Sequence, residues 1–171
     1  MNSALRPSLL ALPILAALLA SPVRGQSVDP LLVESYRDAL RVPDTALKID
    51  VIRNLGSLPI TPENEILTEA LLPDLVEVFR NDRHPITRRE AVLAISSFHV
   101  PGVLPALYEA LASPDANVRY EAVKSLALIG DDSSLDPLRT AFTDSFPHVR
   151  REAARTLQAI QKRSTRPKAS R

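Results

Sequence analysis

The sequence predicts an all-α fold in which about four helix pairs stack into an α-α superhelix, or solenoid. Three observations predict it. A string of arginine, glutamate and apolar residues occurs three times at a step of 31 residues. A second apolar segment lies ahead of each copy. Helices in four pairs would account for nearly all of residues 29–162, which leaves no room for a sheet.

The second helix of each pair is the most clearly defined element. Its copies begin at Thr87, Val118 and Val149, and each has an arginine one residue on, a glutamate three residues on and an alanine four residues on. In the middle copy, apolar residues follow Val118 at four, five, eight and eleven positions. This is the spacing of the buried stripe of an amphipathic helix.

The first helix of each pair is indicated by the strings LPDLVEVF, LPALYEAL and LDPLRTAF, which begin at Leu72, Leu104 and Leu135. Each string ends just before a polar turn that contains Asp, Ser or Asn together with Pro. Such side chains accept hydrogen bonds from the free N–H groups of the following helix, and proline suits a first helical turn. Each unit is therefore predicted to be a helix, a turn and a helix.

A fourth, more degenerate unit lies earlier in the chain. The segment that starts at Tyr36 matches the segment that starts at Leu107 at an offset of 71 residues. In this alignment Lys48 takes the place of Arg119, and a Pro-Asp turn precedes both. The first helix pair is thus expected before residue 57.

The connection that follows this first pair is longer than the others. Thr61 and Pro62 have the pattern of an N-cap and a first-turn proline, and the helix that they open meets Pro73. We interpret this segment as an extra turn or a kinked helix, and not as a domain boundary.

The string PDANVRYEAVKSLALIG, from Pro114, resembles the HEAT-like repeat, in particular the short version of bilin-lyase-type repeat proteins. The resemblance is strong over units two to four and weak over the first. The patterns of tetratricopeptide and ankyrin repeats are absent. The sequence departs from the HEAT-like pattern at Thr87, where valine is usual, and a glycine ends the second helix only at Gly56 and Gly130.

The recurring basic residues Arg88, Arg119 and Arg150, with Lys48 as a weaker equivalent, form a predicted ladder along the stack. The resemblance implies that they tie adjacent repeats together. A guanidinium group carries five donors, so it can satisfy turn carbonyls and the carboxylate of a neighbour at once. Partners in the next repeat are also expected for the recurring glutamates, which are Glu90, Glu121 and Glu152.

Two further rows lie off the apolar stripe of the second helices. One contains Arg89, Tyr120 and Arg151, and the other contains Leu93, Lys124 and Arg155. The resemblance implies that second helices line the concave surface, so we predict partner contacts there, with a solvated helix face as the alternative. A basic groove with a tyrosine suits an acidic protein segment or a carboxylate-rich ligand. The candidate contact residues are Arg89, Tyr120, Lys124, Arg151 and Arg155.

No catalytic residue, cofactor or metal ligand is predicted. The three histidines, His84, His99 and His148, lack a spacing that would place ligands on one helix face. The chain has no glycine-rich phosphate loop and no Gly-x-Ser-x-Gly elbow. With no cysteine, it also has no thiolate nucleophile and no disulfide.

The chain begins with the pattern of a signal peptide. Arg6 precedes an apolar run from Leu9 to Ala20, which is shorter than the roughly 20 residues of a membrane-spanning helix and is interrupted by Pro13. A retained anchor or a buried helix is the alternative. The predicted parts are a signal peptide (1–25), a HEAT-like repeat domain (26–162) and a basic flexible tail (163–171).

The charges are distributed unevenly between these parts. Residues 26–161 hold 14 Lys and Arg against 20 Asp and Glu, whereas residues 162–171 hold five basic residues and no acid. An acidic repeat domain argues against nucleic-acid binding. The tail is predicted to be solvated, with attraction to an anionic envelope surface as the alternative.

Taken together, these patterns predict a non-catalytic protein-binding or scaffolding module in the cell envelope. The signal-peptide pattern together with the absence of an Asn-x-Ser/Thr acceptor favours a periplasmic or secreted bacterial protein. Two alternatives stay open. One is a bilin-lyase-like or other enzyme-accessory repeat protein, and the other is a structural subunit of a larger envelope assembly.

Overall fold

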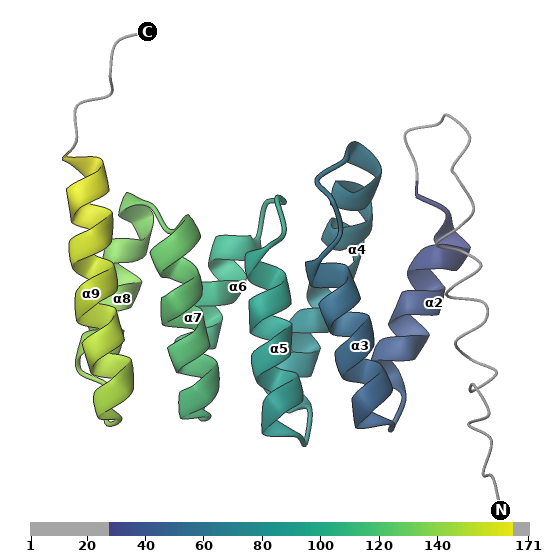
Figure 1. Ribbon diagram of the computed structural model, residues 1–171, viewed down its shortest axis with the longest axis horizontal. Coiled ribbons are helices and arrows are strands. Elements are labelled where there is room, and N and C mark those ends of the chain that lie inside the picture. The colour runs from purple at the N-terminus through teal and green to yellow at the C-terminus, as the bar shows by residue number, and fades with distance from the viewer. Residues whose placement is uncertain (1–27, 166–171) are drawn as a thin grey trace, which may run out of the picture.

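The computed structural model describes residues 28–165 as a row of helices (Figure 1). The predicted all-α fold is confirmed, since this part of the chain contains eight α-helices, one 3-10 turn and no strand. The predicted signal peptide and residues 166–171 of the predicted tail lie outside the described residues. The elements are α2 Pro30–Arg41, α3 Thr45–Gly56, α4 Pro62–Asn81, α5 Pro85–Ser96, α6 Val103–Ala110, α7 Ala116–Ile129, η1 Asp132–Ser134, α8 Leu135–Phe142 and α9 Pro147–Ser164.

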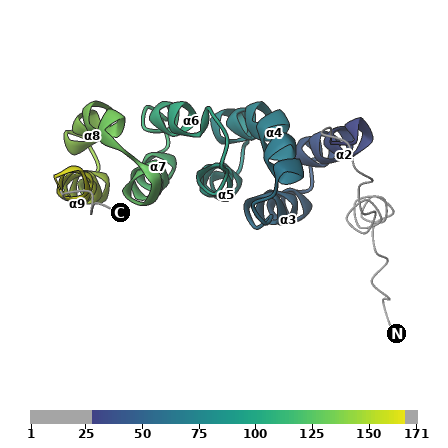
Figure 2. The same cartoon turned by 90° about the horizontal axis from the view of Figure 1, so that it is seen from above.

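The helices form two layers. Figure 2 shows the first helices (α2, α4, α6 and α8) in one layer and the second helices (α3, α5, α7 and α9) in the other. Neighbouring second helices share more extensive contacts than neighbouring first helices do. The exposed sides of the second helices form one face of the stack, which we call the inner face. No helix in the described part is long and apolar enough to cross a membrane.

The turns between paired helices begin each second helix two residues ahead of the recurring series that starts at Thr87, Val118 and Val149. Helices α5, α7 and α9 start at Pro85, Ala116 and Pro147, which keeps the 31-residue step of the sequence. At α7 the side chain of Asp115 accepts a hydrogen bond from Asn117 N at 2.9 Å. At α3 Asp44 accepts one from Leu47 N at 3.0 Å. Both carboxylates satisfy N–H groups that have no partner within the helix.

Helix α4 is a single helix of 20 residues. The predicted N-cap is confirmed, because Thr61 Oγ1 accepts a hydrogen bond from Asn64 N at 3.2 Å. Pro73 lies inside the helix. It has no N–H to donate to the carbonyl of Glu69, so the helix loses one internal hydrogen bond there.

The apolar stripe of the second helices forms the core between the layers. Ile95 and Leu126 are fully buried, as is Leu55 at the equivalent place in α3. Leu157, their equivalent in α9, is only half-buried. The difference arises because α9 is the last described helix, so no further repeat covers its outer side.

Thr87 lies where the HEAT-like pattern has valine, and it is fully buried at the start of α5. Its hydroxyl has no hydrogen-bond partner. Burial of an unpaired hydroxyl costs free energy, so this departure from the pattern destabilises the stack slightly.

Gly130 ends α7 where a larger residue would not fit. A Cβ atom there would lie 2.5 Å from Leu126 O and 3.1 Å from Ile160 Cδ1 of α9. Arg163, near the end of α9, donates to Gly130 O at 2.9 Å and to Ala127 O at 2.9 Å. These bonds satisfy free carbonyls at the end of α7. Helix α9 extends through Ser164, two residues past the expected end of the repeat domain at residue 162.

Candidate functional site

The ladder residues bind carboxylates in the turns of the following repeats. Lys48 Nζ lies 2.5 Å from Asp82 Oδ2, and Arg88 forms an ion pair with Asp115. Arg119 binds Asp144 with two donors, Nε to Oδ2 at 2.5 Å and Nη2 to Oδ1 at 3.0 Å. Each pair joins one repeat to the next, as the resemblance implies.

Each ladder arginine also donates to the turn of its own repeat. The Nη1 atoms of Arg88, Arg119 and Arg150 donate to the carbonyl six residues earlier, at 2.8, 2.8 and 2.6 Å. Within the described residues, Arg150 has these carbonyl contacts but no carboxylate partner. The ladder thus has three complete pairs and one cation at its end.

The pairs hold the turn carboxylates in their charged form. Arg119 and Asp144 are only 12% and 7% exposed. The hydrogen bond from Arg119 lowers the pKa of Asp144, although burial opposes it. At Asp82 burial by itself raises the pKa, but the bonds from Lys48 and from His84 N more than offset it and lower the pKa.

These lowered pKa values predict acid destabilisation. A carboxylate whose pKa is lower in the folded state stabilises the fold above its unfolded pKa, and this contribution is lost as pH falls through the folded pKa. We expect the free energy of unfolding to be steady above about pH 5 and to fall below about pH 4. Urea denaturation across this range measures it. The Asp144→Asn variant should lose less stability on acidification than the parent, and an equal loss would contradict the assignment.

The recurring glutamates have other partners than expected. Glu90 pairs with Arg53 of the preceding repeat, Oε2 to Nε at 3.0 Å, and with Arg89 beside it at 2.9 Å. Glu121 pairs with Lys124 of its own helix at 3.1 Å. The prediction of partners in the next repeat was therefore wrong for Glu90 and Glu121. Glu152, in the last described repeat, pairs with Arg155 of its own helix. In a helix, residues three apart are neighbours, which makes the pairs of Glu121 and Glu152 local.

The predicted contact residues lie on the exposed side of α5, α7 and α9, where the paired glutamates lie deeper. Glu90, Glu121 and Glu152 are 5%, 9% and 20% exposed at their side chains. Their partners Arg89, Lys124 and Arg155 are 46%, 46% and 75% exposed. Arg151 is exposed as well. The exposed side chains of this face are therefore basic, although the covered glutamates beneath them balance much of their charge.

Tyr120 lies half-buried near the centre of this face. Its ring meets His148 of α9 edge-on, with centroids 5.4 Å apart, and the Lys124 Nζ lies 5.8 Å from the Tyr120 centroid. The aromatic contact fixes the tyrosine between α7 and α9.

Arg53 of α3 belongs to the same face, and the sequence reasoning missed it. It lies 71 residues before Lys124, which is the offset that aligns the first unit with the third. The same alignment that identified Lys48 could therefore have found Arg53. It was overlooked because the first unit is the most degenerate one.

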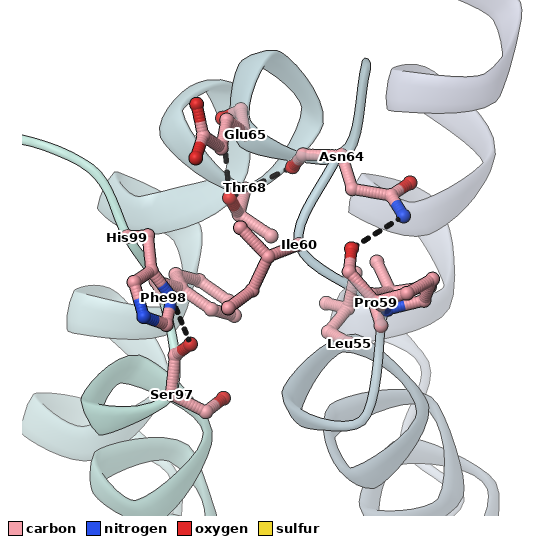
Figure 3. A pocket seen from close by; sticks show the side chains of 10 residues that line it. Leu55, Pro59, Ile60, Asn64, Glu65, Thr68, Ser97, Phe98 and His99 are labelled. Atoms are coloured by element: carbon pink, nitrogen blue, oxygen red, sulfur yellow. Dashed lines mark hydrogen bonds between the residues drawn. The ribbon is translucent and has the colours of Figure 1, made fainter. Parts of the chain in front are cut away.

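A small pocket lies where the loop after α3 meets the loop after α5 (Figure 3). Ile60 and Phe98 contribute apolar walls, and Thr68 donates to Asn64 O at 2.8 Å. Its volume is about 20 Å³, which suits about one water molecule and not a cofactor. No cluster of metal-ligating side chains occurs within residues 28–165.

A family model for HEAT repeats matches residues 104–170. A comparison with curated proteins finds no match. The crystal structure of an engineered protein is 22% identical with a TM-score of 0.50, covering 76% of this chain and 62% of that one. A second engineered protein is 23% identical with a TM-score of 0.49, covering 75% and 37%. The chain thus spans less than two thirds of either engineered protein.

The geometry and the fold of the engineered structure define the class of protein, a helical solenoid, and residues 104–170 are similar to HEAT repeats. The HEAT resemblance is confirmed over that range. At this level of identity, the engineered structure supports the fold alone. The bilin-lyase type of repeat stays a prediction.

Proposed function

We propose that the chain is a non-catalytic scaffold that binds a partner protein across the inner face of α5, α7 and α9. One observation carries the proposal, namely that exposed basic side chains from two neighbouring rows of these helices lie above glutamates that are largely covered. A regular stack of helices presents such rows on a rigid surface, as solenoids do.

The partner that fits this face is a protein segment rich in carboxylates. Arg89 bonds to Glu90 through Nη2. A guanidinium group has five donors, so others stay free for a ligand. The covered glutamates hold the cations in place, which lowers the entropy lost on binding. Tyr120 adds an aromatic surface at the centre of the row, which is typical of binding hot spots.

Reversing two charges on this face is expected to abolish partner binding. In the Arg89→Glu/Arg151→Glu variant, two attractive contacts become repulsive, and we expect at least about a 100-fold loss of affinity. Cross-linking and mass spectrometry on the tagged protein in its own cells would identify the partner and the cross-linked residues. Titration of that partner against both proteins would then measure the loss.

The matched control is Arg80→Glu/Arg139→Glu, which makes the same charge change on the layer of first helices. It should leave the affinity within about two-fold, because rim and remote charges act mainly on association rate. Circular dichroism should show unchanged helix content in both variants. Equal binding by the parent and the Arg89→Glu/Arg151→Glu variant would refute the proposed face.

We also propose that the protein acts in the cell envelope, on the strength of the apolar run and small residues near the N-terminus. Export predicts a mature chain that begins at Gln26. Cell fractionation followed by N-terminal sequencing checks it. A mature protein that retains residues 1–25 in the cytoplasmic fraction would contradict this location.

A further inference from the structure

The junctions between repeats follow one rule. At each of the three junctions, a ladder cation on a second helix binds the turn aspartate of the next repeat. These aspartates are Asp82, Asp115 and Asp144, and all three are largely covered.

The two ends of the stack carry the two halves of this junction. At the α9 end, Arg150 has no carboxylate partner among the described residues. At the α2 end, Asp44 is exposed in the α2–α3 turn and forms no ion pair within the described part of the chain. It aligns with Asp115 in the repeat pattern. Each end thus lacks the group that the other end offers.

The apolar stripe shows the same complementarity. Leu47 in α3 is half-buried, whereas its equivalents Thr87, Val118 and Val149 are fully buried. Leu157 in α9 is half-buried where its equivalents are fully buried. The side chains that a neighbouring repeat would cover are therefore partly open at both ends.

The segments on either side of the described part offer no side-chain carboxylate to Arg150. The residues outside the described part, 1–27 and 166–171, contain no Asp or Glu. Figure 1 places α2 and α9 at opposite ends of the row, so Arg150 and Asp44 of one molecule do not meet.

We propose that the α8–α9 end of one molecule stacks on the α2–α3 end of a second copy, with Arg150 bound to Asp44. The junction continues the interface that already joins the repeats. A second pair is available in the same register as the one between α3 and α5, because Arg155 and Asp50 occupy the positions of Arg53 and Glu90. Since the two surfaces differ, the contact is head-to-tail and forms open chains unless the rotation closes a ring.

Charge exchange at the junction tests the proposal on the full chain. Sedimentation velocity over a series of protein concentrations should show particles that grow with concentration. Arg150→Glu alone and Asp44→Arg alone should each leave monomers, because every junction then has two like charges. A mixture of the two variants should assemble again, since the Glu of one variant faces the Arg of the other.

Two further variants separate the junction from effects on folding. Asp44→Asn removes the charge but keeps an oxygen that can cap α3, and it should weaken association about ten-fold without a change in helix content. Glu77→Lys makes a charge reversal on an exposed side of α4, within the stack, and should leave association unchanged. Circular dichroism confirms the fold of each variant.

The other outcomes overturn the proposal. They are a parent chain that stays monomeric at every concentration, a symmetric dimer that does not grow further, and association that persists in Arg150→Glu. The last result would mean that the contact does not involve Arg150. A negative result for the head-to-tail contact would not contradict partner binding at the inner face, because that binding is measured separately with the Arg89→Glu/Arg151→Glu variant.

Discussion

Replacing Arg119 by alanine is expected to lower the free energy of unfolding by about 3 kcal/mol, the lower end of the range for one partner of a buried ion pair. Arg119 binds Asp144 with two donors and Ser113 O with a third. Its removal leaves the covered carboxylate of Asp144 without a counter-charge and frees a turn carbonyl. Urea denaturation, monitored by circular dichroism, measures the shift in the midpoint of unfolding.

Two further variants provide a comparison for the stability lost in Arg119→Ala. Arg119→Lys keeps the charge but cannot reproduce the paired donors of the guanidinium, so it should recover only part of the stability. Arg150→Ala removes the equivalent residue where the described chain offers no carboxylate partner, and it should cost about 1 kcal/mol for its carbonyl bonds. If Arg119→Ala cost no more than Arg150→Ala, the ion pair between repeats would contribute nothing.

Replacing Leu126 by alanine is expected to lower the free energy of unfolding by about 2–5 kcal/mol, because this side chain of α7 is fully buried. The loss combines the transfer of the side chain to water with the cavity that it leaves. Leu157 occupies the same repeat position in α9 but is only half-buried. Leu157→Ala should therefore cost clearly less, and thermal and urea unfolding of both variants provide the comparison.

This pair of variants tests the one-dimensional character of the fold. In a solenoid each repeat is stabilised by its neighbours, so a side chain with neighbours on both sides contributes most. Equal losses at the two positions would mean that Leu157 is covered as well as Leu126 in solution. At high protein concentration, the proposed head-to-tail contact predicts a larger effect at Leu157 than at low concentration.

Sequence reasoning located the ladder because its residues recur at a constant step. A constant step places Arg88, Arg119 and Arg150 at the same point of successive helices, whatever the detail of the packing. The glutamates recur at the same step, yet the partners of Glu90 and Glu121 were predicted wrongly. A carboxylate on a helix has basic neighbours both three residues along and on the adjacent helix, and periodicity does not choose between them.

The sequence also did not predict which side chains of the inner face are covered and which are exposed. Glu90 and Arg89 are adjacent in the chain, but one is covered and the other is about half exposed. The rotation of α5 about its axis decides which of the two is covered, and that rotation depends on how α3 and α7 pack beside it.

By itself the sequence determined the helix pairs, their phase, their capping aspartates and the row of ladder cations, because these depend on local spacing and turn chemistry. Only the tertiary structure decided which carboxylate each cation binds and which glutamates lie beneath the basic face. It also decided that Asp44 and Leu157 lack the cover that their equivalents have, and that Arg150 lacks a carboxylate partner among the described residues. Those properties depend on how one repeat is set against the next, which no single repeat encodes.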